Sequence, residues 1–193
     1  EMADGGSSGS RVRLAADRTA LVVVDMQERL MAAMPEEARD RTVRNVGILL
    51  SLSGRMGLPA LATEQYPKGL GRTIPEVRDA VADFRPVEKI AFSSCGAAGF
   101  MDRITANRTR DVVVAGTETH VCVFQTVCDL LDSGLNVHVP SDAVCSRTVS
   151  NWEVGLRLME RAGAVITSTE TVVFDVLRVA GTDDFKFMAP LLK

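Results

Sequence analysis

The chain is poor in aromatic residues and histidine, and it has no marked excess of charge of one sign. Aromatic side chains make up 5% of the 193 residues, with one Trp and one Tyr, and there are two histidines. The 22 basic and 25 acidic residues give a net charge of −3 and are interspersed along the chain. Proteins that bind a phosphate backbone usually gather basic residues on one face, so we expect no nucleic-acid partner.

Long hydrophobic runs are absent as well. No apolar run approaches the roughly 20 residues that cross a bilayer, and the N-terminal residues lack the apolar segment of a secretory signal. We therefore expect no membrane partner and a cytoplasmic location. Residues 1–12 include the linker-like run Gly5–Ser10 and are expected to be a disordered tail or an expression remnant. A hydrophobic content of 46% is enough for one core, so residues 13–193 are expected to form a single domain.

The cysteines and histidines do not have the spacing of a metal site or of a disulfide framework. The four cysteines form no CxxC pair, and the histidines form neither an HxH nor an HExxH motif. The cysteines are Cys95, Cys122, Cys128 and Cys145, and the histidines are His120 and His138. We expect free thiols, no metal and no other cofactor. His138 lies between two valines and is expected to be a core or rim residue.

Apolar runs and helical patterns alternate along the chain. The expected strands are residues 20–24, 58–63, 87–92, 112–114, 135–140 and 164–167. The expected helices are residues 36–56, 74–81, 97–107, 121–131, 151–161 and 171–179. Strands that alternate with helices favour a parallel sheet covered on both faces. The pattern therefore predicts an α/β fold, a three-layer α/β/α sandwich around a six-stranded, mostly parallel sheet.

Cys122 lies in a segment, residues 111–134, that combines a strand, a turn and a helix. Three consecutive valines are followed by Gly116, and apolar residues then recur at helical spacing until Gly134. Cys122 is thereby predicted in the first turn of the helix, where unpaired N–H groups and the helix dipole lower a thiol pKa. On this segment alone, a small buried apolar residue is the more common interpretation of such a cysteine.

Two charged residues lie at the ends of other predicted strands. Asp25 follows the apolar run 20–24, and ligands of open parallel sheets bind at this carboxyl edge. A simple turn-capping role for Asp25 is an equal alternative. Lys89 lies in the third strand, where a buried ammonium needs a carboxylate partner. A surface position for Lys89 is the alternative.

Three motifs in this order resemble the isochorismatase-like superfamily of cysteine hydrolases. They are Ala-Leu-Val-Val-Val-Asp-Met-Gln at 20–27, Val-Glu-Lys-Ile-Ala-Phe-Ser at 87–93 and Val-Ala-Gly-Thr-Glu-Thr-His-Val-Cys-Val at 114–123. The segment 63–71 is similar to the isochorismatase-domain-containing subgroup. The resemblance implies a homo-oligomer, either a dimer or a tetramer, that acts on a small-molecule substrate.

The resemblance also implies roles for individual residues. Cys122 would be the nucleophile, Asp25 the base that takes its proton, and Lys89 the cation that holds the pair. A non-proline cis peptide would join Thr117 to Glu118, and the N–H groups of Glu118 and Cys122 would form an oxyanion hole. The expected substrate pocket is lined by Gln65, Tyr66, Phe92, Glu118 and His120.

Two departures from the family narrow the expected chemistry. Nicotinamidases hold a metal with an aspartate and histidines after the second strand, whereas residues 63–67 contain no histidine. True isochorismatases lack a cysteine at the position of Cys122. The resemblance therefore implies a metal-independent hydrolase that cleaves the C–N bond of an amide, carbamoyl or ureido compound through a thioester.

Two other functions stay open at this point. The chain could be a redox-responsive protein in which Cys122 is oxidised reversibly to sulfenic acid or to a disulfide with Cys95 or Cys128. The chain could also be a catalytically idle scaffold of the same fold. The presence of Asp25, Lys89 and Cys122 together disfavours the scaffold.

Overall fold

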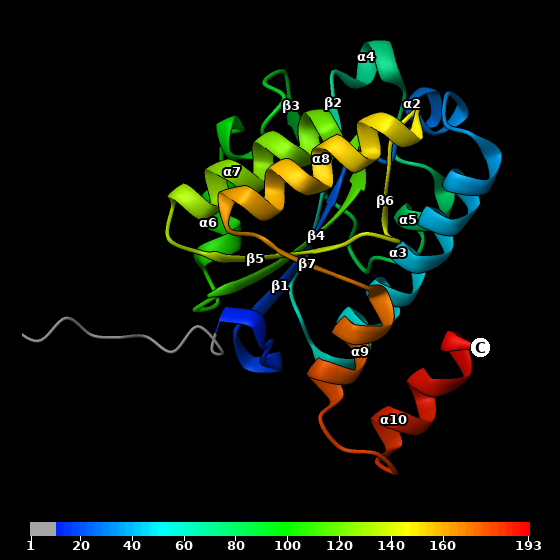
Figure 1. Cartoon of the computed structure of the whole chain (residues 1–193), viewed down its shortest axis with the longest axis vertical. Helices are drawn as coiled ribbons and strands as arrows, with labels where there is room; N and C mark the ends of the chain where they lie inside the picture. Colours follow the sequence, from blue (N-terminus) through cyan, green and yellow to red (C-terminus); the bar gives the residue numbers. More distant parts are fainter. Residues whose placement is uncertain (1–10) are drawn as a thin grey trace, which may run out of the picture.

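The computed structural model describes residues 11–193, which are built around one β-sheet (Figure 1). The strand order is β3-β2-β1-β4-β5-β7, with the short β6 paired to β4, and every paired strand is parallel. The strands are β1 Thr19–Val24, β2 Ala60–Gln65, β3 Val87–Lys89, β4 Asp111–Thr117, β5 Asn136–Pro140, β6 Val144–Cys145 and β7 Val165–Thr167. Residues 1–10, which include most of the expected tail, lie outside the described residues.

The two central strands are buried along their whole length. All residues of β1 and β4 are buried, which explains their continuous apolar runs: both faces of the sheet are covered. Val23 and Val113 belong to the core on one face, and Val22 and Val114 belong to the core on the other. The alternation of side chains along each strand divides the core in this way.

Helices form the two outer layers (Figure 1). Helices α3, α5, α9 and α10 contribute to one core and α6, α7 and α8 to the other. The main helices are α2 Glu28–Ala32, α3 Glu36–Met56, α4 Pro67–Leu70, α5 Pro75–Arg78, α6 Phe100–Thr105, α7 Phe124–Asp132, α8 Val149–Ala162, α9 Thr169–Leu177 and α10 Asp183–Met188. The α/β/α sandwich predicted from the sequence is confirmed, with a seventh short strand added to the six expected.

The local differences from the predictions have physical causes. β6 has two residues, too few to produce a periodic pattern. The segment Thr119–Val123, called η3, is a π-helical turn rather than the first turn of α7, so Cys122 precedes the α-helix. β3 ends at Lys89 instead of Phe92. The sequence pattern did not predict α10, which begins after a turn in which Thr182 accepts a hydrogen bond from the Phe185 N–H.

Candidate active site

Asp25 lies at the carboxyl end of β1, where the chain leaves the centre of the sheet. Its φ angle is 48°, in the left-handed region that Asp and Asn enter more readily than most residues. Asp25 Oδ2 accepts a hydrogen bond from Lys89 Nζ at 2.7 Å, and Oδ1 accepts one from Thr63 Oγ1 at 2.7 Å. Because β1, β2 and β3 are neighbours and parallel, their carboxyl ends bring these three residues together.

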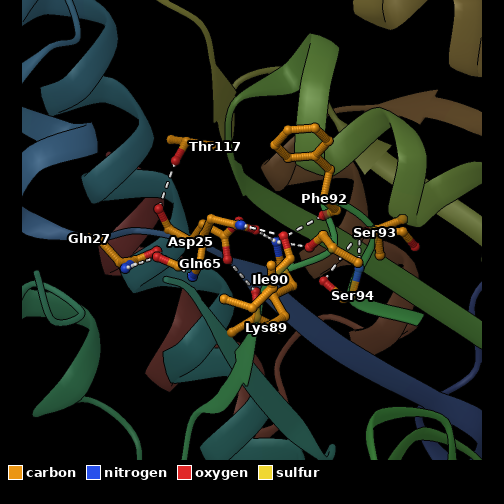
Figure 2. A network of polar contacts seen from close by, with 12 residues as sticks. Asp25, Gln27, Gln65, Lys89, Ile90, Phe92, Ser93, Ser94 and Thr117 are labelled. Atoms are coloured by element: carbon orange, nitrogen blue, oxygen red, sulfur yellow. Dashed lines mark hydrogen bonds and ion pairs between the residues drawn. The ribbon is translucent and has the colours of Figure 1, made fainter. Parts of the chain in front are cut away.

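The Lys89 ammonium is saturated by protein acceptors. Besides Asp25, it donates to Gln65 Oε1 at 2.7 Å, to Phe92 O at 2.8 Å and to Ala91 O at 3.3 Å (Figure 2). The side chains of Lys89 and Asp25 are both 0% exposed. An ammonium has three N–H donors, so Lys89 holds no spare donor for a substrate. Lys89 is therefore buried and paired, rather than the surface residue that was the alternative.

Gln65 supports this ion pair from β2. Its Nε2 donates to Ile90 O at 2.7 Å while its Oε1 accepts from Lys89, so both ends of the amide are engaged. Gln27 holds the Gln65 backbone: Gln27 Oε1 accepts from Gln65 N at 2.7 Å, and Gln27 Nε2 donates to Gln65 O at 2.9 Å. Gln65 thus faces the ion pair rather than an open pocket.

Gln27 and Thr63 belong to the site although no role was predicted for either of them. Both are polar residues within or beside apolar runs, which is the signal that could have identified them. Burying such a side chain requires a hydrogen-bond partner, and here the partners belong to the Asp25 and Gln65 network.

The Cys122 thiol lies beside the ion pair but is itself buried, with 6% of the residue exposed. Burial and the Asp25 carboxylate raise the pKa of Cys122 to about 12, whereas the Lys89 ammonium lowers it. The expectation of a depressed thiol pKa was therefore wrong for this state of the protein. Removal of the thiol from water is the largest cause, and it favours the neutral form.

The Thr117–Glu118 peptide bond, at the end of β4, is cis, as the resemblance implied. Thr117 Oγ1 donates to the backbone oxygen of Asp25 at 2.8 Å and so ties β4 to the end of β1 (Figure 2). The Glu118 carboxylate accepts hydrogen bonds from Arg147 N and Nε, each at 3.1 Å. The Glu118 carboxylate is thus paired with Arg147, whereas the prediction placed Glu118 in the lining of the substrate pocket.

The remaining expected pocket residues lie on the rim. Tyr66 is 52% exposed and Phe92 is 54% exposed, and the Phe92 ring projects away from the ion-pair network (Figure 2). Tyr66 and Lys89 line a cavity of about 290 Å³. On the opposite side, His120 Nδ1 lies 3.0 Å from Ser146 Oγ. The reaction centre is thus flanked by two different surfaces.

Comparison with known proteins identifies the family. The model of the isochorismatase domain matches residues 19–171, which include Asp25, Lys89 and Cys122. The chain belongs to the isochorismatase family. Similar relatives include the secreted isochorismatase effector Isc1 of Phytophthora sojae, 33% identical over 189 residues that cover 94% of this chain and 87% of that protein. Isochorismatase domain-containing protein 2A of Mus musculus is 32% identical, over 94% of this chain and 85% of its own length.

Solved structures agree with this assignment to the isochorismatase family. The MAR1 ribonuclease from Caenorhabditis elegans is 34% identical, superposes with a TM-score of 0.86, and matches 93% of this chain and 92% of its own. YcaC from Pseudomonas aeruginosa is 22% identical, with a TM-score of 0.87 over 93% of this chain and 90% of its own, and shows the same fold. This isochorismatase-like hydrolase thus shares its fold along most of its length with these proteins.

The described residues of this isochorismatase-family chain contain neither a candidate metal site nor a candidate membrane-spanning helix. Within residues 11–193, no three or more His, Cys, Asp or Glu side chains are grouped so that they could hold a metal ion. Over the same residues, no helix is both long enough and apolar enough to cross a bilayer. The chemistry that the site itself offers is a thiol beside a carboxylate that a saturated ammonium holds in place.

Proposed function

We propose that this chain is a cysteine hydrolase that cleaves a C–N bond of a small amide, carbamoyl or ureido compound without a metal. The observation that carries the proposal is the buried ion pair of Asp25 and Lys89 beside the Cys122 thiol. A thiol with a pKa near 12 is not a nucleophile at neutral pH, so it needs a base within reach. Asp25 is the carboxylate placed to serve as that base.

In the first half-reaction, the Cys122 proton passes to Asp25 as the sulfur attacks the substrate carbonyl carbon. The new S–C bond gives a tetrahedral oxyanion, for which the N–H groups of Glu118 and Cys122 are the proposed donors. The oxyanion collapses, the C–N bond breaks, and the proton held by Asp25 goes to the leaving nitrogen. Ammonia or an amine departs, and a thioester on Cys122 remains.

In the second half-reaction, water replaces the amine. Asp25 accepts a proton from the water molecule while the water oxygen attacks the thioester carbon. Asp25 then returns the proton to the Cys122 sulfur as the C–S bond breaks. The products are the free thiol and a carboxylic or carbamic acid. Lys89 gives up no proton in this cycle; its constant positive charge keeps Asp25 in place when the carboxylate is ionised.

The test is hydrolysis of a panel of small amides and ureido acids by the wild type, Cys122→Ala and Asp25→Asn. We expect ammonia release by the wild type, loss of at least about a thousandfold in both variants, and an acyl adduct on Cys122 of the wild type by intact-protein mass spectrometry. Turnover that survives Cys122→Ala would overturn the proposal. Arg147→Lys is assayed alongside these variants. It changes the hydrogen bonding of the Glu118 carboxylate without removing a proposed proton carrier.

The panel also tests the rival functions. Peroxide-dependent, reversible loss of the Cys122 thiol without amide turnover would favour the redox function, and the absence of both activities would favour a scaffold. RNA is included because the Caenorhabditis elegans relative is named a ribonuclease. RNA cleavage that persists in Cys122→Ala would point to a site other than the one proposed.

Assembly and location are also proposals. The YcaC gene product from Escherichia coli, which shares the fold at 23% identity, is described as octameric. We propose that this chain is a homo-oligomer, with a dimer or tetramer expected in light scattering. One relative is named as secreted, so the cytoplasmic location also stays a prediction, to be tested by fractionation of the producing cells.

A further inference from the structure

Tyr66, directly after β2, has a backbone conformation that tyrosine rarely adopts. Its φ angle is 36°, in the left-handed region that glycine and asparagine enter far more readily than an aromatic residue. Glycine would therefore form the turn from β2 into α4 at a lower cost in free energy. Residues in such strained conformations persist where their surroundings hold them, and they are frequent at functional sites. The turn alone does not account for a tyrosine at position 66.

Gly69, in the short helix α4, leaves room for the Tyr66 ring. The φ angle of Gly69 lies outside the left-handed region, so the backbone does not require glycine there. A Cβ at residue 69 would lie 2.5 Å from Tyr66 Cδ1 and closer still to Cε1. Because an aromatic ring is rigid, any side chain at residue 69 would displace it. Residues 66 and 69 therefore act together to keep the ring in one position.

Tyr66 and Lys89 both line the cavity of about 290 Å³, so this cavity adjoins the reaction centre. The Tyr66 N–H donates to the Lys89 backbone oxygen at 2.9 Å, and Gln65 Nε2 donates to Ile90 O at 2.7 Å. Two wall residues, Tyr66 and Ile90, are thus fixed by the network that also holds the Asp25 carboxylate. They nevertheless remain 52% and 74% exposed. The network therefore presents two large, partly apolar side chains to solvent beside the reaction centre.

The walls of this cavity are mainly apolar and carry no net charge. Tyr66, Pro67 and Ile90 contribute apolar surface, whereas Lys68 and Glu88 contribute one charge of each sign. Burial of apolar groups of a ligand against such walls is favourable, and burial of an unpaired charge is not. The cavity is thus suited to an uncharged, apolar group.

We propose that Tyr66 is a specificity-determining residue that selects substrates with an uncharged, apolar acyl group. The acyl group occupies the cavity between Tyr66 and Ile90, and Gly69 allows the Tyr66 ring to pack against it. The substrate class is then the amide of a short, uncharged aliphatic acid. This inference rests on the proposed hydrolase function and adds the substrate class to it. Tyr66 touches the substrate without taking part in bond making or breaking.

Tyr66 is the chain's one tyrosine, so incorporation of 3-fluorotyrosine places a single ¹⁹F probe on its ring. The labelled Cys122→Ala protein is titrated with acetamide, propanamide, butanamide and pentanamide, and with succinamate as a charged amide of similar length. We expect a saturable shift of the ¹⁹F resonance, with binding that tightens roughly fourfold for each further methylene group that is buried. Succinamate should bind at least about tenfold more weakly than pentanamide, unless Lys68 selects an anion.

Two matched glycine variants of the labelled Cys122→Ala protein test the position of the ring. Gly69→Ala displaces the Tyr66 ring, so it should shift the ¹⁹F resonance of the free protein and weaken binding of pentanamide at least about fivefold. The control is Gly47→Ala in α3, where an added Cβ meets nothing within 4 Å. It should leave both the resonance and the binding unchanged. A circular dichroism melt of each variant checks that the fold is kept.

A third variant, Tyr66→Asn in the otherwise wild-type chain, removes the ring and keeps a residue that tolerates the left-handed backbone. It should lower the ratio of kcat/KM for pentanamide to kcat/KM for acetamide at least about fivefold, because only the longer acyl group reaches the ring. This variant carries the test if Gly69→Ala does not fold.

Several outcomes would overturn the inference. These are no ¹⁹F response to any amide, binding of succinamate as tight as that of pentanamide, and equal effects of Gly69→Ala and Gly47→Ala. If Cys122→Ala abolishes turnover while Tyr66→Asn leaves the ratio of kcat/KM values unchanged, the hydrolase function stands and the role of Tyr66 fails. Binding that tightens with chain length and weakens in Gly69→Ala, without turnover of any amide, would support the acyl-binding cavity and overturn the hydrolase function.

Discussion

The two halves of the candidate site are built in opposite ways. On the β1–β2–β3 side, Asp25, Thr63, Gln65 and Lys89 satisfy one another in a closed, buried network. On the β4–β6 side, the Glu118 carboxylate is bonded to the exposed Arg147, and the buried Thr119 Oγ1 has no hydrogen-bond partner among residues 11–193. A saturated network resists rearrangement, whereas polar atoms without partners remain available to a ligand. We expect the β1–β2–β3 half to be the more rigid of the two, so that it holds Asp25 in one position.

The strongest test of the saturated half is Lys89→Met. It leaves the Asp25 carboxylate buried without its counter-ion, so the free energy of unfolding should fall by roughly 3–5 kcal/mol in urea denaturation, and hydrolysis should be lost. The double variant Asp25→Asn with Lys89→Met should regain much of that stability but no activity. A double variant no more stable than Lys89→Met would contradict the claim that the unpaired charge causes the loss.

On the β4–β6 side, Gly155→Ala tests how tightly α8 supports η3. A Cβ at Gly155 would lie 2.9 Å from Thr119 O and 3.0 Å from His120 N, so backbone must shift next to Cys122. We expect a loss of about 1–3 kcal/mol in stability and a drop in kcat. The control is Gly54→Ala in α3, where nothing lies within 4 Å and a gain of about 0.5–1 kcal/mol is expected. Equal behaviour of the two variants would show that the close approach is unimportant.

A smaller effect is expected for Thr63→Val, which removes one hydrogen bond to Asp25 and keeps the shape of the side chain. A hydrogen bond to a charged group contributes about 1.5–3 kcal/mol, and here the second carboxylate oxygen keeps its bond to Lys89. We expect a fall in kcat with little change in KM. If KM rises instead and kcat is kept, Thr63 acts on substrate binding rather than on Asp25.

The smallest change, a severalfold rate effect, is expected in thiol reactivity. Because Asp25 raises the pKa of Cys122, Asp25→Asn should lower it and speed alkylation by iodoacetamide at about pH 8, even though hydrolysis is lost. Peptide mass mapping separates Cys122 from Cys95, whose pKa burial raises to about 11. Slower alkylation of Cys122 in the variant would mean that the carboxylate does not hold the thiol neutral.

The same pKa has a consequence for alkaline stability. The Cys122 thiol ionises near 8.5 in an unfolded chain and near 12 in the folded protein, so the folded state binds the extra proton between these values. Its contribution to stability is complete below about pH 8.5 and is lost as the pH rises toward 12. The free energy of unfolding of Cys122→Ala should therefore fall less steeply with rising pH in that range than the free energy of unfolding of the wild type.

The sequence predicted the sheet well because its strands are apolar on both faces. The valine runs before Asp25 and Gly116 identify β1 and β4 and place Asp25 at the correct edge. The cost of burying an unpaired ammonium predicted a carboxylate partner for Lys89, and the resemblance to the family indicated that this partner is Asp25. Local patterns were therefore sufficient where burial dictated the residue types.

Features that depend on distant contacts were not predictable in this way. The π-helical turn of η3 and the two-residue β6 leave no periodic signal in the sequence. The pKa of Cys122 depends on burial, which becomes visible only when η3 packs against the rest of the protein. The contact of the Arg41 guanidinium with the Trp152 ring joins α3 to α8, more than 100 residues apart in the chain, and nothing in either segment alone indicates it.

The left-handed backbone at Asp25 also bears on how such a protein can change over evolutionary time. Few side chains adopt a φ of 48° readily, and Asn is the residue closest to Asp in both shape and tolerance of this geometry. Asp and Asn codons differ by a single base. One point mutation therefore leads from a protein with a complete acid–base pair to one that keeps the fold without its proton carrier, and selection for another use of the fold could begin from there.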